Sequence, residues 1–351
     1  MYSPQETRCW ILNSKPTGSV VLDGDNPTFS LETTKLPSLG DNQLLVRTLY
    51  ISNDPAQRTW IGDSIPGGRL YTKAVEVGEV MGARGIAEVI ESTSSKFQKG
   101  DHVLLLARVG WTEYAVVGEN DVAILDPLPR GLSETHYLGA FGGTGLTAYY
   151  GLVVQCEAKK GEKVVVSGAA GATGSMVVQI AKHLVGAGTV IGIAGSDEKC
   201  RWVEQLGADI CLNYKSPSFA KDLEDATGAS VNIYFDNVGG ETLDRMLPLM
   251  APHGRIAVCG AISNYNGEDI VPLRNWFQVI FLRLRIQGFA VLDYLSKAGE
   301  VKKILAQAVE DGKLRIDEGS ETVVEAKFED IPRVWLKLFD GQNKGKLITA
   351  L

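Results

Sequence analysis

A short strand followed by a glycine-rich turn and a helix constrains this chain more than any other stretch. Val164-Val165-Val166 is typical of a buried strand, and a helical pattern runs from Ser175 to Leu184. The turn between them contains Ala169-x-Gly171-x-x-Gly174, which is the dinucleotide-binding pattern G-x-G-x-x-G with alanine in place of the first glycine. Gly171 would let the backbone approach a pyrophosphate, and Gly174 would let the helix pack closely on the strand. The stretch predicts a nucleotide site, and an ordinary tight turn is the alternative.

Strands and helices alternate in the segment that surrounds this turn. Such a rhythm predicts right-handed βαβ units and a parallel sheet that is covered on both faces. The expected helices are 145–154 and 197–206, and the expected further strands are 190–194, 233–235, 255–258 and 286–289.

The two ends of the chain follow a different pattern. Residues 1–129 are rich in short strands and turns, with predicted strands at 43–51, 85–91 and 114–117 and no long helical pattern. The tail carries a helix at 301–309, a strand at 322–326 and a helix at 330–339, so the βα rhythm breaks there. We therefore expect an α/β fold. A doubly wound parallel-sheet (Rossmann) nucleotide domain spans 130–291, and a mostly β domain is built from 1–129 and 292–351.

Composition narrows the class of protein. The chain has 351 residues, which suits two domains, and a net charge of −7, which disfavours nucleic acid and anionic membranes as partners. The five cysteines are scattered, as in a reducing compartment. No signal peptide and no apolar stretch of 18 residues is evident. We expect a cytoplasmic protein.

The end of the second βα strand predicts the cofactor. An acid at this position would bind the ribose 2′-hydroxyl of NAD, but the strand ends Ala194-Gly195-Ser196. A hydroxyl with Lys199 nearby suits a 2′-phosphate, so NADPH is favoured. Asp197 is the residue that could oppose this interpretation, and Lys199 could instead belong to a solvated helix face.

The four histidines lie outside any Cys/His cluster with metal-ligand spacing, so no metal site is predicted. Hydride transfer without a metal favours an acceptor that is already electrophilic, such as a C=C bond conjugated to a carbonyl. Hydride would go to the β-carbon, and negative charge would grow on the oxygen as an enolate. A neutral donor such as a tyrosine, with a usual pKa of about 10, would stabilise that charge.

Several further strings occur in order along the chain. They are Asn53-Asp54-Pro55, Gly110-Trp111-Thr112-Glu113-Tyr114, Gly145-Leu146-Thr147-Ala148-Tyr149, Ala194 to Lys199, Asn213-Tyr214-Lys215, Phe235 to Gly240 and Cys259 to Asn266. With these strings the whole chain resembles the medium-chain dehydrogenase/reductase superfamily. It is most similar to the zinc-free branch of prostaglandin reductases and plant 2-alkenal double-bond reductases. The resemblance implies that the mostly β domain is GroES-like.

The resemblance also assigns residues to the cofactor. It places Ala172 and Thr173 against the pyrophosphate, and Gly195, Lys199 and Tyr214 around the 2′-phosphate. The residues implied near the nicotinamide or closing over the cofactor are Pro55, Asn237, Cys259, Phe289, Asn343 and Gly345. Tyr265 would lie beside the nicotinamide ribose, order the cofactor and, with the ribose, stabilise or help protonate the enolate. The plainer alternatives are a core cysteine for Cys259, a helix-capping turn after Asn237 and a loop tyrosine for Tyr265.

Two positions depart from the family pattern. Better-known members carry a tyrosine after Asp-Pro, where this chain has Ala56, and plant members place another pocket tyrosine where Arg84 falls. Loss of two aromatic walls and gain of a cation suggest a larger or anionic substrate. A surface ion pair for Arg84 is the alternative.

The predicted function is NADPH-dependent reduction of the C=C bond of an α,β-unsaturated ketone or aldehyde. A zinc-free quinone reductase, an allylic-alcohol dehydrogenase and a non-catalytic NADP-binding protein stay open. The alternating segment Leu282 to Gln287 matches the region through which relatives pair, so the resemblance implies a homodimer.

Overall fold

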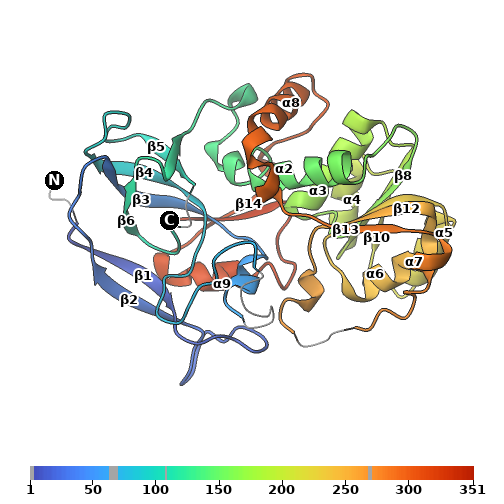
Figure 1. Cartoon of the computed structure of the whole chain (residues 1–351), viewed down its shortest axis with the longest axis horizontal. Helices are drawn as coiled ribbons and strands as arrows, with labels where there is room; N and C mark the ends of the chain where they lie inside the picture. Colours follow the sequence, from blue (N-terminus) through green and yellow to red (C-terminus); the bar gives the residue numbers. More distant parts are fainter. Residues whose placement is uncertain (1–3, 63–69, 107–108, 268–270) are drawn as a thin grey trace.

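The computed structural model describes residues 4–62, 70–106, 109–267 and 271–351. The chain forms two lobes that lie side by side (Figure 1). Strands from the N-terminal part fill one lobe, and strands β8 to β13 with their helices fill the other. The C-terminal end lies in the first lobe, so the chain crosses between the lobes twice.

The second lobe is built on a parallel six-stranded sheet. Its order is β10-β9-β8-β11-β12-β13, and every neighbouring pair is parallel. The strands are β8 (Lys163–Val166), β9 (Thr189–Ala194), β10 (Ile210–Asn213), β11 (Val231–Asp236), β12 (Met250–Val258) and β13 (Arg285–Gly288). This is the doubly wound order in which the direction of winding reverses between the first and fourth strands, here β8 and β11. The predicted Rossmann sheet is confirmed.

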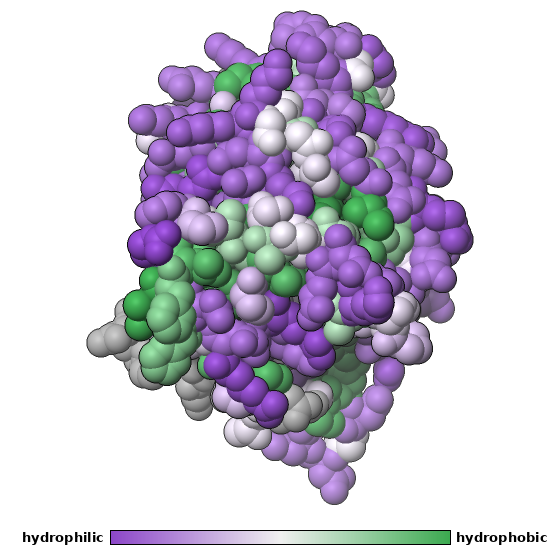
Figure 2. Space-filling model, turned by 90° about the vertical axis from the view of Figure 1, so that its right-hand side faces the viewer, coloured by the Kyte–Doolittle hydropathy of each residue, from purple (hydrophilic) through white to green (hydrophobic). Residues whose placement is uncertain are grey.

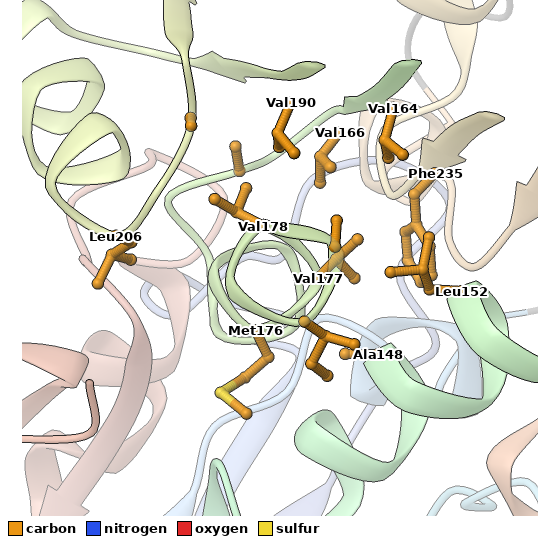
Figure 3. Close-up of a cluster of buried hydrophobic side chains, with 14 of the residues drawn as sticks. Ala148, Leu152, Val164, Val166, Met176, Val177, Val178, Val190, Leu206 and Phe235 are labelled. Atoms are coloured by element: carbon orange, nitrogen blue, oxygen red, sulfur yellow. The ribbon is translucent and has the colours of Figure 1, made fainter. Parts of the chain in front are cut away.

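Alternate residues of the buried strands point to opposite faces of this sheet. Val164 and Val166 belong to one apolar cluster and Val165 to another, because side chains alternate along a strand. Figure 3 shows the first cluster, in which Val177 and Val178 face Val166, Val190 and Phe235. The helices are α2 (Gly143–Tyr149), α3 (Ala172–Gln179), α4 (Asp197–Gln205), α5 (Phe219–Thr227), α6 (Gly240–Met246), α7 (Gln278–Phe281) and α8 (Ala298–Glu310). Both α2 and α3 continue as wider π-helical turns, at Tyr150–Gln155 and Ile180–Val185.

The first lobe is mostly β, as expected. One sheet has the order β14-β15-β3-β4-β5-β7, with β6 also paired to β3, and β1 pairs separately with β2. Trp111 and Trp335 meet edge to face at 5.6 Å in its core and are fully buried. The strands are β1 (Glu6–Leu12), β2 (Phe29–Lys35), β3 (Gln43–Ser52), β4 (Gly85–Ser92), β5 (His102–Leu105), β6 (Tyr114–Gly118), β7 (Val122–Ile124), β14 (Glu321–Glu325) and β15 (Lys346–Ala350). The helices are α1 (Gln57–Trp60) and α9 (Ile331–Leu336).

The tail divides between the two lobes. Strand β15 pairs with β3, as the break in the βα rhythm suggested. Helix α8, however, buries Val301, Leu305 and Val309 in the cluster of the parallel sheet. The boundaries at 130 and 292 stay a prediction, and α8 lies on the tail side of the second one.

All five cysteines are free thiols. Among the described residues, no helix is long and apolar enough to cross a membrane.

Candidate active site

The glycine-rich turn connects β8 to α3 with little space to spare. A Cβ added at Gly174 would lie 2.2 Å from the Gly168 carbonyl oxygen, so only glycine fits there. Ala169, in place of the first glycine, is fully buried, and its amide donates to the Ile193 carbonyl at 2.9 Å. Gly171 caps α3, whose first N–H groups have no acceptor within the helix. Gly171, Ala172 and Thr173 are half-buried, so this positive helix end stays accessible to an anion.

A buried carboxylate organises the neighbouring strand end, where the sheet reverses its winding. Asp236 ends β11 and is fully buried. Its Oδ1 accepts hydrogen bonds from Ser167 Oγ at 3.0 Å, the Tyr234 hydroxyl at 2.8 Å and the Gly239 amide at 3.0 Å. Burial nevertheless raises the pKa of Asp236. The next residue, Asn237, donates through Nδ2 to the Ser167 carbonyl at 2.7 Å, which ties β11 to the glycine-rich turn.

Two of the three residues predicted for the 2′-phosphate, Gly195 and Tyr214, meet at the end of β9. A Cβ at Gly195 would lie 3.0 Å from the ring of Tyr214, so the tyrosine packs against bare backbone. Tyr214 is anchored by its amide, which donates to Ala194 at 3.0 Å. Lys199 reaches across to the tail, where Nζ donates to the Gly341 carbonyl at 2.7 Å. Burial lowers the pKa of Lys199, and the nearby charge of Lys215 acts in the same direction.

The acid that could oppose an NADP site is already engaged. Asp197 Oδ1 accepts a hydrogen bond from Asn213 Nδ2 at 2.8 Å. The neighbouring Ser196 is the N-cap residue of α4, because its side chain accepts a hydrogen bond from the Lys199 amide at 3.2 Å.

The tail lies directly against the glycine-rich turn. The Gly345 amide donates to the Ala170 carbonyl at 2.8 Å, and Gly345 and Gly171 form an isolated parallel bridge. Gly345 has a φ of +62°, and a Cβ there would lie 1.9 Å from the Ser320 carbonyl oxygen. Asn343 Nδ2 donates to the Gly345 carbonyl at 2.9 Å. The two tail residues predicted to close over the cofactor therefore lie beside its predicted site.

Lys346 joins the same tail to the Asp-Pro segment after β3. Its side chain is only 3% exposed, and Nζ donates to Asp54 Oδ1 at 2.6 Å and to the Asn53 carbonyl at 2.8 Å. Ser52 Oγ donates to the other carboxylate oxygen of Asp54 at 2.6 Å. Burial is the largest influence and alone would raise the pKa of Asp54, but the charge and hydrogen bond of Lys346, together with the Ser52 hydrogen bond and the Arg84 charge, outweigh it and the pKa is lowered. This pair fixes Asp54 and, through the chain, Pro55.

Two phenols and a thiol gather near the ends of β11 and β12. The Tyr265 hydroxyl accepts a hydrogen bond from the Ala261 amide at 3.3 Å. Burial raises the pKa of Tyr265 to about 12 and that of Cys259 to about 12, so both groups are protonated at neutral pH. A thiolate at Cys259 or a phenolate at Tyr71 would raise the pKa of Tyr265 further.

Tyr71 is a site residue that sequence reasoning missed. Burial raises the pKa of this phenol, and the charges of Cys259 and Asp54 add to the effect. Its side chain is 61% exposed, so the phenol lies at the surface of the site. No motif contains it. Arg58 was also missed, and its Nε donates to Asn266 Oδ1 at 3.2 Å beside Tyr265.

The remaining predicted residues lie in different surroundings. Phe289 packs edge to face on Phe235 with ring centroids 6.2 Å apart, so its ring belongs to the apolar cluster behind β11. Pro55 and Ala56 are half-buried just before α1. The Arg84 carbonyl accepts from the Ser52 amide at 2.9 Å, which places Arg84 beside the start of the Asp-Pro segment.

Comparisons with known proteins assign the chain to a family. A model described as zinc-binding dehydrogenase matches residues 172–310, and one described as N-terminal domain of oxidoreductase matches residues 8–125. The NADPH-dependent curcumin reductase of Escherichia coli is 36% identical over 98% of this chain and 96% of that protein. Bovine prostaglandin reductase 1 is 39% identical over 92% and 94%. The chain belongs to the zinc-free branch of the medium-chain dehydrogenase/reductase superfamily.

Solved structures agree with this oxidoreductase family. CurA from Vibrio vulnificus, also solved in complex with NADPH, has a TM-score of 0.85 and is 33% identical over 98% of both chains. A quinone oxidoreductase from Pseudomonas syringae, with a TM-score of 0.74 and 20% identity, shares the fold. Among residues 4–62, 70–106, 109–267 and 271–351, no three His, Cys, Asp or Glu side chains gather where they could hold a metal ion.

The Lys346–Asp54 pair carries the first prediction. Lys346→Met leaves the Asp54 carboxylate without its partner in a largely buried place, and we expect the free energy of unfolding to fall by about 3 kcal/mol. Because the pKa of Asp54 is lowered in the folded protein, its stabilisation is present above the unfolded pKa and disappears as the pH falls through the folded one. In the variant, burial without Lys346 raises the pKa of Asp54, so protonation relieves the buried charge and the stability deficit relative to the wild type should shrink as the pH falls. Urea unfolding at a series of pH values measures both effects.

Lys221→Met is the matched control, since its ion pair with Asp225 is exposed. We expect it to leave the urea midpoint unchanged. Equal midpoints for Lys346→Met and wild type would mean that the buried pair does not hold the tail.

Proposed function

We propose that this oxidoreductase uses NADPH to reduce the C=C bond of an α,β-unsaturated ketone or aldehyde. The observation that carries the proposal is the position of the Tyr265 phenol, whose hydroxyl accepts from the Ala261 amide next to the strand ends where an open α/β sheet binds its ligand. The identities to a curcumin reductase and a prostaglandin reductase support the same class of reaction.

NADPH fits the residues at the end of β9. Bare backbone at Gly195 leaves room for the adenosine ribose beside Tyr214, and Lys199 supplies a cation for the 2′-phosphate. The first turn of α3, at Ala172 and Thr173, presents amides to the pyrophosphate. Gly345 and Asn343 would close the tail over it, and Pro55, Asn237, Cys259 and Phe289 are the proposed neighbours of the nicotinamide.

The bound cofactor supplies a hydride to the β-carbon of the substrate. As that bond forms, the C=C electron pair moves toward the carbonyl and its oxygen gains charge as an enolate. The Tyr265 O–H donates a hydrogen bond to this oxygen and, with the cofactor ribose, stabilises it. The α-carbon then takes a proton, which Tyr265 or water supplies, and the product is the saturated carbonyl compound.

Tyr265 also needs to be held in place. Its own hydroxyl accepts from the Ala261 amide, and Arg58 of the first lobe donates to the neighbouring Asn266. These two contacts fix the phenol relative to both lobes. Because Tyr265 is already in position, no free energy would be spent on reorienting this proton donor during the reaction.

We also propose that the protein acts as a homodimer. Strand β13 is the outer strand of the parallel sheet, and α7 beside it exposes Phe277, Ile280 and Phe281 by 65% or more. Figure 2 shows this end of the molecule, where apolar residues gather within a largely hydrophilic surface. A second copy could extend the sheet and cover them. Five free cysteines suit action in the cytoplasm.

A panel of 2-alkenals, enones, quinones and allylic alcohols, with NADPH or NADP⁺ as appropriate, tests the reaction. We expect stoichiometric NADPH loss with enals and enones, and kcat about 10²-fold lower for Tyr265→Phe. Since the pKa of Tyr265 is about 12, kcat of the wild type should not fall through loss of this proton below pH 10. Tyr137→Phe removes a phenol that donates to Asp126 instead, and serves as control.

The panel also separates the alternatives. Turnover of quinones alone would indicate a quinone reductase, and oxidation of allylic alcohols alone an alcohol dehydrogenase. Tight NADPH binding with no turnover of any compound would indicate a non-catalytic binding protein. An unchanged kcat for Tyr265→Phe would remove the proposed donor.

The choice of cofactor has its own test. Lys199→Ala removes the cation proposed for the 2′-phosphate, so we expect KM for NADPH to rise about 10- to 100-fold while KM for NADH stays constant. Lys303→Ala changes an exposed lysine on α8 and should alter neither value. A similar rise in KM for NADPH and for NADH would mean that Lys199 does not contact the 2′-phosphate.

The dimer is checked by sedimentation velocity. We expect wild type to sediment as a dimer and Phe281→Glu, which places a charge in the apolar patch, as a monomer with unchanged circular dichroism. Glu241→Gln on the exposed face of α6 is the control. Sedimentation of the wild type as a monomer at micromolar concentration would contradict the homodimer.

A further inference from the structure

Arg84 is a half-buried cation without a partner. Among the residues the structure describes, its guanidinium has neither an ion pair nor a side-chain hydrogen bond, although it is largely withdrawn from solvent. A charged side chain in such surroundings is normally paired, because loss of hydration must be compensated. The surface ion pair that the sequence left open is therefore not present.

Its position is set by the first lobe. Arg84 immediately precedes β4, and its carbonyl accepts from the Ser52 amide at 2.9 Å, so it lies beside the residues that lead into Asp54 and Pro55. The other side of the guanidinium faces the second lobe, since a Cβ at Gly143 would lie 3.5 Å from Nη1. Arg84 thus stands where α2 approaches the Asp-Pro segment.

The carboxylate on which the Arg84 charge acts does not neutralise it. The charge of Arg84 reaches Asp54, but both Asp54 oxygens are taken, Oδ1 by Lys346 and Oδ2 by Ser52. Lys346 and Asp54 cancel each other. The positive charge of Arg84 is left over, and no described residue supplies an anion for it.

We propose that Arg84 binds a carboxylate of the substrate, so that the compound reduced is an α,β-unsaturated carbonyl compound carrying an acid group. This inference rests on the proposed function and names its substrate class. A guanidinium presents two parallel N–H groups that match the two oxygens of a carboxylate. A monoanion fits better than a phosphate dianion, because Lys346, the neighbouring cation, is already engaged.

The placement also orients the substrate. Arg84 interacts with Asp54 on the side of the first lobe, whereas Tyr265 lies with Cys259 and Asp236 on the side of the second. The carboxylate would therefore lie at one end of the site and the carbonyl oxygen at the other, with the C=C bond between them.

The test uses a series of enones with a terminal carboxylate on spacers of increasing length, each paired with its methyl ester. With NADPH, we expect the wild type to favour the best-fitting acid over its ester by about 10- to 100-fold in kcat/KM. Arg84→Gln should remove this preference while leaving ester turnover within about twofold. Arg84→Lys should keep part of it, and Arg333→Gln, which changes an exposed arginine, all of it.

Equal kcat/KM for acid and ester in the wild type would overturn the proposal. So would an equal loss for both in Arg84→Gln, and a fluorescence titration showing that this variant binds NADPH correspondingly weakly would then assign Arg84 to the cofactor.

A binding measurement keeps the two proposals separate. The saturated keto acids and their esters are titrated calorimetrically into the NADP⁺ complex. If no enone is reduced, the proposed reaction fails, but tighter binding of the acid that Arg84→Gln abolishes would still support the carboxylate site. Equal binding of acid and ester would overturn it.

Discussion

The buried ammonium of Lys346 holds the candidate active site together. It neutralises Asp54 and donates to the Asn53 carbonyl, while the preceding Gly345 amide donates to the glycine-rich turn. Two adjacent residues of the tail thereby touch both lobes. A lone buried charge is unfavourable, so Lys346 and Asp54 require each other, and the Asp-Pro segment cannot move away from the tail without exposing or separating them. The position of Pro55 relative to the proposed pyrophosphate site follows from this pair.

The second lobe contributes a site that arises from topology. Winding reverses between β8 and β11, which leaves their carboxyl ends free of a crossing connection. The glycine-rich turn and Asn237 occupy these two ends and are tied together through Ser167. Asp236 beneath them accepts several hydrogen bonds, so the loops that surround the proposed nicotinamide site are held by a buried network. Such a network gives Tyr265 and Cys259 fixed surroundings in which burial keeps both protonated.

The first lobe presents its own side chains to the site. The sequence predicts that Ala56 and Arg84 stand where other family members carry aromatic residues, and Tyr71 supplies a phenol from a part of the chain that carries no motif. The residues that would bind NADPH are thus separate from the residues that would select the substrate. Charge distinguishes the two surfaces: the cations near the cofactor site have a proposed phosphate partner, whereas Arg84 has no partner within the described protein.

The sequence by itself determined the parallel sheet, the glycine-rich turn and the residues at the end of β9. These are local features, because alternation of apolar residues and the steric needs of Gly174 and Gly195 act between near neighbours in the chain. Only the tertiary structure decided that α8 packs on the parallel sheet, that Lys346 pairs with Asp54 across 292 positions, and that Tyr71 lies near Cys259. It also decided that Arg84 has no counter-ion among the residues that the structure describes. Partners of buried charges are chosen by proximity in space, and a pattern in one sequence carries no record of that proximity.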